Sequence, residues 1–593
     1  MSPHPPPPTP RHHHHQSSTA ITRSDDLGLP LRTHEHFLLH CGKTRQAAAT
    51  LENKLILRAE DPFASSAWNQ AVPLRLPRRT TTLPAVHRCF EKQSLMPVSA
   101  AFLFAWHERS GAFERLAPPW EQMRIIRKEG SIRDGDRLIF AVRKGPFWLP
   151  WEAAHKNYVP VLGPSDVGQF EDVQVRGPFA YWSHIHSCRP FPRPTGSGPG
   201  DQAPLGEPPQ VKAAGPAPVD NNISGQSLLH DQVEYSLPLG LLGRAAGGAF
   251  VRKVIERMFT FRHERTLRDV RRHALAQSSL VMSGLPPLMR VGMSGSGGAI
   301  GSQLLHFLTT GGHRVDRLVR RKADATKGEI FWQPGAGSRG GQIDDAALEG
   351  CDAIIHLAGE GVASGRWTPA KMAAIRDSRV EGTKLIARAA ASLRNRPRVL
   401  VVASGIHYYG DRGDQELTEE AGVGSGFLAE VSREWEAAVK PAEEAGIRVV
   451  ILRIGLVLSP RGGLLARLLP FARAGLMPVL GSGTQWWSWI GQDDLMGVIL
   501  HALSTESVRG PLNAVAPQPV TMREFADRLA RTVKRPLGLR VPGWLLRAGA
   551  GEMADVALTS TRAVPDLLRR AGFKFMTPSL SAALSWEILG EVK

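Results

Sequence analysis

A run of apolar residues that ends in a cluster of glycines marks the clearest structural unit of the chain. Residues 288–293 are mostly apolar, glycines follow at positions 295, 297, 298 and 301, and residues 302–309 repeat apolar positions at helical spacing. This order predicts a buried strand, a tight turn and a helix. Further apolar runs at 313–319, 352–357, 398–404 and 449–452 alternate with long amphipathic stretches such as 365–390. The alternation predicts an α/β fold with a doubly wound parallel sheet of the Rossmann type.

The glycine turn predicts a dinucleotide-binding site. A glycine accepts the backbone conformation of a tight turn, allows the chain to approach a pyrophosphate, and lets the helix pack closely on its strand. The amide groups at the start of the helix then face the phosphates. The residues expected to bind the cofactor in this turn are Ser294, Gly295, Gly298, Ala299, Ile300 and Gly301. The strand 352–357 ends in Leu357, Ala358 and Gly359, whose small size leaves room for the adenosine half of the cofactor.

The residues after the second strand indicate which dinucleotide is bound. NAD-binding folds place an acidic residue there for the ribose 2′-hydroxyl, but this chain has Arg320, Arg321 and Lys322. Guanidinium groups bind a 2′-phosphate through charge-assisted hydrogen bonds. We therefore expect NADP(H), with NAD(H) disfavoured; a solvated basic turn is the alternative explanation.

The chain before residue 288 has a different pattern. Residues 1–88 begin with a proline- and histidine-rich segment and predict a disordered tail. Short strand-like runs at 137–142, 173–175, 180–186 and 228–237 and a basic helix at 250–266 predict an α+β domain over 89–271. A proline- and glycine-rich segment, 189–227, predicts a flexible insert in a hairpin. We expect a linker at 272–287, the Rossmann domain at 288–535 and a small C-terminal lobe at 536–593.

Composition narrows the range of functions. The chain has 593 residues and a formal net charge of +18, but the basic residues are scattered and match no nucleic-acid-binding motif. Its four cysteines match no metal or redox motif and indicate a reduced, cytoplasmic protein. No apolar stretch is long enough to span a membrane. The tag-like run His12–His15 is no argument for a metal site, and none is predicted.

Several segments of the first domain resemble the SRPBCC (START-like) superfamily. The most specific are Trp106-His107, Pro118-Pro119-Trp120 and Arg262-His263. The resemblance implies a helix-grip fold, in which an antiparallel sheet wraps a long helix and encloses an apolar cavity. Aromatic residues of this segment fit either the wall of a ligand cavity or a filled core. His184 and His186 lie on one face of a predicted strand, and a satisfied or solvent-facing pair is favoured over a functional one.

The segment from Met289 to Leu584 resembles the atypical extended short-chain dehydrogenases that are epimerase-like, through HLAGE, GRWTPAK, FLAEVSREWE and LNAVAPQPVT. The resemblance places Asp344 at the adenine and Ser404 at a substrate oxygen. The Tyr-x-x-x-Lys pair of ordinary members is absent: its window holds Phe427 and Val431, or Leu428 and Ser432. The family's Trp-Ile-His-Ile-Asp-Asp appears here as residues 489–494 with Gly491 and Gln492 in the middle.

Three further residues remain candidates for chemistry. Tyr408 and Tyr409 are substitute acids or packing residues under the cofactor, and Arg453 is a candidate for binding an anionic substrate. We therefore expect an NADP(H)-binding oxidoreductase or epimerase that acts on a small molecule, and the sequence leaves its assembly open between a monomer and a homodimer. The alternative is a non-catalytic protein that senses NADP(H) or binds an apolar ligand, with a regulatory role such as in cell division.

Overall fold

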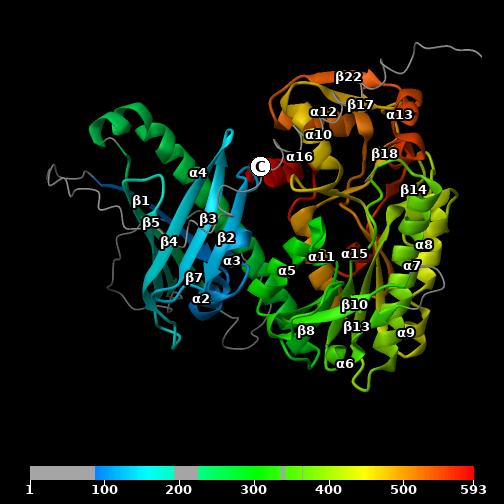
Figure 1. The fold of residues 1–593 in the computed structure, drawn as a ribbon, viewed down its shortest axis with the longest axis horizontal. Coiled ribbons are helices and arrows are strands. Elements are labelled where there is room, and N and C mark those ends of the chain that lie inside the picture. Colours follow the sequence, from blue (N-terminus) through cyan, green and yellow to red (C-terminus); the bar gives the residue numbers. More distant parts are fainter. Residues whose placement is uncertain (1–86, 192–224, 239, 336–340, 364, 593) are drawn as a thin grey trace, which may run out of the picture. The chain divides into compact units, whose positions relative to one another are not determined.

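The computed structural model describes residues 87–191, 225–238, 240–335, 341–363 and 365–592. All but the last two residues of the predicted tail, 1–88, and most of the predicted insert, 189–227, lie outside these ranges; Arg88 is the first residue of a strand. Two sheets organise the described chain, one in each of two successive domains (Figure 1). None of the described helices combines the length and the apolar character needed to cross a membrane.

The first domain is a seven-stranded antiparallel sheet. Its strand order is β1-β7-β6-β5-β4-β3-β2. Buried and less buried residues alternate along β7, as expected for a strand with one face toward a core. Pro190 pairs with Ser227, so residues 191–226 are inserted between the paired strands β6 and β7. The strands are β1 (Arg88–Met96), β2 (Met123–Glu129), β3 (Arg137–Lys144), β4 (Phe147–Val159), β5 (Gly168–Arg176), β6 (Tyr181–Pro190) and β7 (Ser227–Ser236).

Helices complete the first domain. The short helices α2 (Ala100–Glu108) and α3 (Ala112–Leu116) follow β1, and the 43-residue helix α4 (Gly240–Met282) follows β7 and packs on the sheet (Figure 1). The basic helix predicted at 250–266 is therefore longer at both ends, and residues 272–282 of the predicted linker are helical. Buried Ala276 and Leu280 continue the apolar face to the end of α4. Gly284, at φ 72°, then ends the helix.

The second domain confirms the predicted doubly wound α/β fold. Its eight-stranded sheet has the order β11-β10-β9-β8-β12-β13-β15-β20, and every neighbouring pair except β10–β11 is parallel. The chain proceeds outward from β8 in one direction and from β12 in the other, which is the switch point where such sheets bind ligands. The strands are β8 (Arg290–Ser294), β9 (Arg314–Val319), β10 (Glu329–Gln333), β11 (Gln342–Ile343), β12 (Ala353–His356), β13 (Val399–Gly405), β15 (Arg448–Ile454) and β20 (Gly510–Ala514).

Each face of this sheet has its own core. Ile355 packs with α5 (Ala299–Thr310) and α11 (Gln492–Ser504), whereas Ile354 packs with α7 (Pro369–Ser392) and α9 (Lys440–Glu444) on the opposite face. Successive residues of a strand point to opposite faces, so an uninterrupted apolar run is required where both faces are buried. This explains why the strand runs in the second half of the sequence show little alternation.

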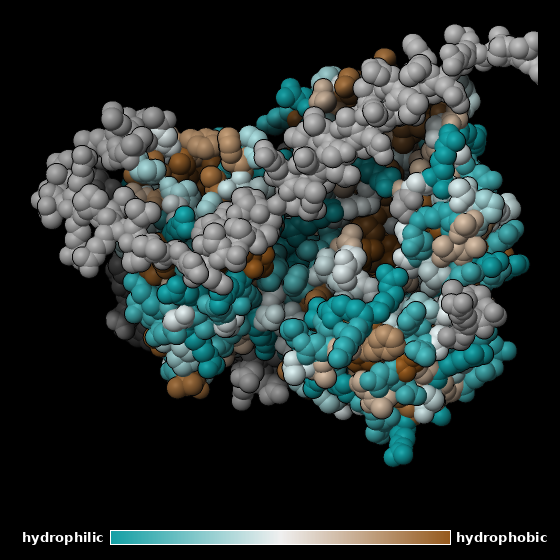
Figure 2. Space-filling view, in the orientation of Figure 1, coloured by the Kyte–Doolittle hydropathy of each residue, from teal (hydrophilic) through white to brown (hydrophobic). Residues whose placement is uncertain are grey.

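The C-terminal lobe is larger than predicted. It contains β22 (Leu537–Val541), α13 (Gly543–Ala550) and α16 (Leu580–Leu584), as expected for residues 536–593, but α10 (Gly463–Arg473), β17 (Met477–Leu480) and α12 (Met522–Thr532) share the same core. The reason is the pairing of β17 with β22, which brings two distant segments together. A hollow with hydrophobic residues opens between this lobe and helices α7 and α8 (Phe427–Ala437) (Figure 2).

Candidate nucleotide and active site

The glycine turn after β8 has the geometry that a dinucleotide site requires. Gly295 adopts φ 74°, and a Cβ there would lie 2.8 Å from the backbone nitrogen of Ala358. A Cβ on Gly301 would lie 2.1 Å from the carbonyl oxygen of Gly295. These two glycines therefore allow the turn, the end of β12 and the first turn of α5 to pack closely.

The outer side of the turn is open to a ligand. A Cβ on Gly297 would meet nothing within 4 Å, and one on Gly298 would meet only the oxygen of Gly295, at 3.3 Å. Gly298 is the N-cap of α5 and offers no side chain to the first amide groups of the helix. Ala299 and Ile300 begin the helix at this point. The turn thus presents uncapped amide groups and unfilled space, which fit the pyrophosphate of a dinucleotide.

Ser294 differs from its neighbours in the turn. Its side chain is fully buried, and its hydroxyl lies 2.6 Å from Nδ1 of buried His356 at the end of β12. Burial, assisted by Arg379, lowers the pKa of His356 to about 3, so its ring is neutral. This pair joins the two strands at the switch point. The hydroxyl of Ser294, which we expected to contact the cofactor, is therefore hydrogen-bonded to a buried side chain of the protein instead. Leu357, Ala358 and Gly359, which follow His356, are more exposed than the strand itself.

The basic turn after β9 contains two arginines in different states. Arg321 forms a salt bridge with Glu329 on β10, with two donor–acceptor distances of 2.6 Å. Arg320 is exposed and has no ion pair with any residue that the structure describes. Asp344 is also exposed, and its carboxylate accepts a hydrogen bond from the amide of Ala347 at the start of the short helix α6 (Asp345–Leu348). Of the two arginines, only Arg320 presents a free guanidinium.

Three residues in register form a polar row at the carboxyl ends of neighbouring strands. Ser404 on β13 pairs with Arg453 on β15, and Arg453 pairs with Asn513 on β20. The hydroxyl of Ser404 donates to Glu436 on α8 over 2.8 Å, and Arg453 binds the same carboxylate through Nε at 3.0 Å and Nη2 at 2.8 Å. The serine hydroxyl, the carboxylate and the guanidinium therefore form one connected network.

Both candidate tyrosines contact this network through Arg453. Tyr409 is fully buried; its hydroxyl donates to Asn513 over 2.7 Å and accepts from Arg453 over 3.0 Å. Burial raises the pKa of Tyr409, although Arg453 opposes the shift. Tyr408 is only partly buried, and the guanidinium carbon of Arg453 lies 3.6 Å from the centre of its ring. Tyr409 is thus held in the interior, and Tyr408 is the better placed of the two for contact with a ligand.

Arg453 and Glu436 change the expectations from the sequence. Arg453, which we expected as a candidate for binding an anionic substrate, is only 2% exposed and is already paired with Glu436 and Tyr409. Burial lowers the pKa of the Arg453 guanidinium, but the Glu436 carboxylate, together with Tyr409, raises it by more. It is positioned to organise the network rather than to bind a free anion. Glu436 was not predicted. Its position in the sequence could have indicated this role. Glu436 lies one helical turn after Ser432 on α8, on the face where ordinary short-chain dehydrogenases carry their tyrosine and lysine.

The sheet, the switch point and the glycine turn define a Rossmann-type nucleotide-binding protein, and comparison with known proteins identifies its family. The model of the NAD dependent epimerase/dehydratase family matches residues 291–514, and that of a domain of unknown function (DUF1731) matches residues 541–587. Epimerase family protein Mb2239 of Mycobacterium bovis is 39% identical over 297 residues, which are 50% of this chain and 96% of the relative. The chain belongs to this epimerase family.

Two solved structures extend the comparison. The nucleoside-diphosphate sugar epimerase from Corynebacterium glutamicum has a TM-score of 0.63 and 30% identity, covering 85% of this chain and 91% of that one. This share exceeds the part of the chain after residue 288, so the match extends into the first domain. Human epimerase family protein SDR39U1 (isoform 2), solved with NADPH, has a TM-score of 0.46 and 30% identity over 51% of this chain and 99% of that one.

Proposed function

We propose that this protein is an NADP(H)-dependent oxidoreductase or epimerase acting on a small-molecule substrate, in which Ser404 and Glu436 replace the usual tyrosine and lysine. The observation that carries the proposal is the hydrogen bond from Ser404 to Glu436 at the carboxyl end of β13. The carboxyl ends of the parallel strands meet at the same edge of the sheet, where the glycine turn also lies. Active sites of doubly wound folds are built at this edge.

The residues at this edge fit NADP(H). The amide groups of Ala299 and Ile300 would hold the pyrophosphate, and Arg320 would bind the 2′-phosphate. The cofactor, when bound, supplies hydride-transfer chemistry. The protein supplies the proton path, in which the Ser404 hydroxyl hydrogen-bonds to a substrate oxygen. When an alcohol is oxidised, its proton passes through this hydroxyl to Glu436; when a carbonyl is reduced, a proton passes in the opposite direction, from protonated Glu436 through the hydroxyl to the substrate oxygen. Arg453 holds the carboxylate in place and offsets its charge.

The test measures NADPH oxidation by the full-length protein with a panel of carbonyl and sugar-nucleotide substrates. General acid–base groups contribute about 10²–10⁴-fold, so Ser404→Ala and Glu436→Gln should each lower kcat by a factor in this range. Tyr408→Phe should have a smaller effect. The matched control is Ser392→Ala at the far end of α7, where the hydroxyl bonds, among the residues that the structure describes, only to the oxygen of Ala389. Turnover that survives the Ser404 and Glu436 substitutions would contradict the proposed site.

A second function is favoured by the first domain. We infer that this domain is SRPBCC-like, since its antiparallel sheet and long helix surround a cavity of about 660 Å³ with many aromatic side chains. Such a volume fits a small apolar ligand. Full retention of NADP(H) binding with no turnover on any substrate of the panel would favour a protein that senses NADP(H) and binds an apolar ligand over an enzyme.

A further inference from the structure

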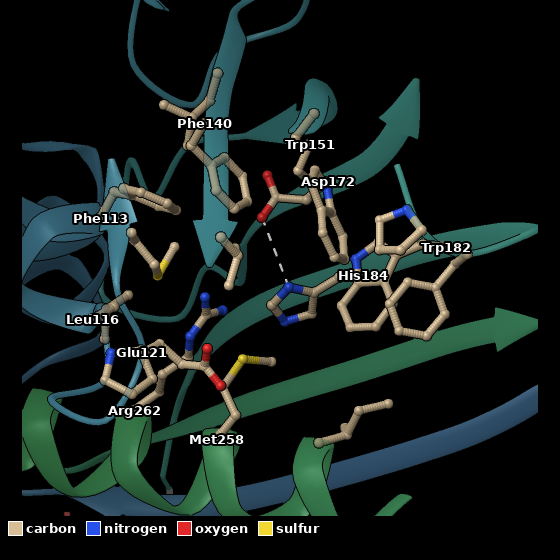
Figure 3. Close-up of a pocket in the computed structure, with 18 of the residues that line it drawn as sticks. Phe113, Leu116, Glu121, Phe140, Trp151, Asp172, Trp182, His184, Met258 and Arg262 are labelled. Atoms are coloured by element: carbon tan, nitrogen blue, oxygen red, sulfur yellow. Dashed lines mark ion pairs between the residues drawn. The ribbon is translucent and has the colours of Figure 1, made fainter. Parts of the chain in front are cut away.

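One end of the cavity in the first domain is polar, although most of its wall is apolar and includes several aromatic rings. Phe113, Phe140, Trp151 and Trp182 surround the apolar part, and Met258 and Arg262 face it from α4 (Figure 3). Asp172 and His184 form the polar end, directly beside the rings of Trp151 and Trp182 (Figure 3). The volume alone indicates an apolar ligand, but the polar end contains chemistry that such a ligand does not need.

Asp172, His184 and His186 converge at this end. One ligand atom from each lies within 4.8 Å of the others. The side chains of His184 and His186 are 2% and 6% exposed, and that of Asp172 is 24% exposed. The two histidines lie two residues apart on β6 and face the same side of the sheet, and Asp172 pairs with His184 across β5 and β6. The sheet itself therefore fixes the three side chains in place.

A further carboxylate, that of Asp231, lies on the opposite side of the two histidine rings from Asp172. Asp172 Oδ2 lies 3.7 Å from His184 Nδ1 and 3.5 Å from His186 Nε2. The opposite ring nitrogens face Asp231 Oδ1 on β7, at 3.4 Å for His184 Nε2 and 2.7 Å for His186 Nδ1. Metal-bound histidines characteristically donate their second N–H to a carboxylate, which fixes the ring and its tautomer. Asp231 is the carboxylate within reach of both rings, although neither contact has hydrogen-bond geometry in the structure.

A second layer holds the two carboxylates. His155 Nε2 lies 2.8 Å from Asp172 Oδ1, and His263 Nε2 lies 2.8 Å from Asp231 Oδ2. The arrangement of two imidazoles and one carboxylate with further positions free is typical of Zn²⁺ and other first-row divalent ions.

We propose that Asp172, His184 and His186 form a binding site for a divalent transition-metal ion at the polar end of the cavity. The ion is held by three protein ligands, so its remaining coordination positions face the apolar space. The site would therefore take an apolar ligand that carries one metal-binding oxygen. This inference concerns the first domain and is independent of NADP(H) binding.

The experiment uses Zn²⁺ and the full-length protein. Because His12–His15 also offers imidazoles, these four residues are first replaced by serine, and the chelator-treated protein is titrated with Zn²⁺ by calorimetry. We expect one equivalent to bind. Asp172→Asn and His186→Gln should abolish this binding, and Asp231→Asn should weaken it about 10–100-fold through loss of ligand orientation. His230→Gln is the matched control, since its neighbour Asp231 faces His184 and His186 and alternation directs His230 to the other face of the sheet.

X-ray absorption of the Zn²⁺-loaded protein provides a measurement that does not depend on the folding of any variant. It should show two imidazole ligands and oxygen ligands, with no sulfur. Absence of Zn²⁺ binding once His12–His15 is replaced would overturn the proposal. A zinc site without histidine, or binding that survives both Asp172→Asn and His186→Gln in folded protein, would also overturn it.

Discussion

Arg320 and Arg321 are adjacent, yet only Arg320 is free to bind a phosphate. Arg321 is paired with buried Glu329, whereas Arg320 is exposed. Arg320→Ala should therefore remove most of the preference for NADPH over NADH, because a charge-assisted phosphate contact contributes about 1.5–3 kcal/mol. Titration of the protein with each cofactor, followed by fluorescence, measures this preference.

Arg321→Ala is the matched comparison for this prediction. It removes the same charge, but it breaks a pair that already exists in the protein, so the NADPH preference should fall by much less. Equal affinity of the unsubstituted protein for NADPH and NADH would contradict a 2′-phosphate site. A larger loss in Arg321→Ala than in Arg320→Ala would mean that the Arg321–Glu329 pair opens when the cofactor binds.

At the residue scale, the sequence predicted those side chains whose role depends on local spacing. Gly295 and Gly301 are examples, since a strand, a turn and a helix that are contiguous in sequence define them. Glu436 and Asp172 were missed because their partners, Ser404 and His184, come from other elements. Strand register brings Asp172 opposite His184, and an apolar pattern alone does not specify register between strands. The two-residue spacing of His184 and His186 predicted that both lie on one face of a strand. It did not indicate whether that face is buried or exposed to solvent.

At the scale of elements, the strand β8, its glycine turn and α5 form one unit whose integrity depends on Gly301. A Cβ at this position would lie 2.1 Å from the carbonyl oxygen of Gly295, which is backbone and cannot move aside easily. Gly301→Val should separate α5 from the turn and lower NADPH affinity by at least about tenfold, together with the melting temperature. Cofactor titration and thermal unfolding measure the two effects.

Gly297→Ala tests whether the losses of NADPH affinity and melting temperature in Gly301→Val arise from the close backbone contact at Gly301. A Cβ at Gly297 meets nothing within 4 Å, so this variant should keep the melting temperature of the unsubstituted protein. A Gly301→Val protein with unchanged cofactor affinity would show that the turn does not depend on this contact.

Elements with an uninterrupted or regular apolar pattern were predicted within a few residues, such as β8 and α7. The length of α4 was not, because its second half is rich in arginine and appears polar in sequence. In the structure, Arg268 and Arg272 are buried by partners from elsewhere in the chain, including Asp494. The lobe boundary was misplaced for a related reason, since β17 and β22 pair across more than fifty residues.

At the scale of the whole described chain, a buried ionic network connects α4 of the first domain to α11 of the second. Arg272 donates to Asp494 over 2.6 Å, and Arg115 on α3 lies 3.2 Å from Asp493, which also pairs with Arg265. These two aspartates belong to the segment in which Gly491 and Gln492 replace the family's histidine and isoleucine. In this protein the segment contributes to the contact between domains.

Glu587, which lies beside Asp493, makes this network sensitive to pH. Burial and the charge of Asp493 raise the pKa of Glu587 to about 8, from an ordinary value of 4.5. Between these two values the unfolded chain has lost the proton while the folded protein retains it, so stability falls as the pH rises through this range. Glu587→Gln imitates the protonated form and still offers an oxygen to the amide of Asp493, which lies 3.2 Å from Oε1.

The melting temperature of Glu587→Gln should therefore equal that of the unsubstituted protein near pH 4 and exceed it at pH 9. A difference of roughly 1–3 kcal/mol at high pH corresponds to several degrees for a protein domain of ordinary size. Thermal unfolding of both proteins across this pH range gives the difference, in which the titration of all other groups largely cancels. Glu552→Gln, at an exposed position, is the control and should show no such trend. A difference for Glu587→Gln that stays constant with pH would mean that Glu587 is already ionised in the folded protein, and that Arg265 and its neighbours stabilise two carboxylates at this contact rather than one.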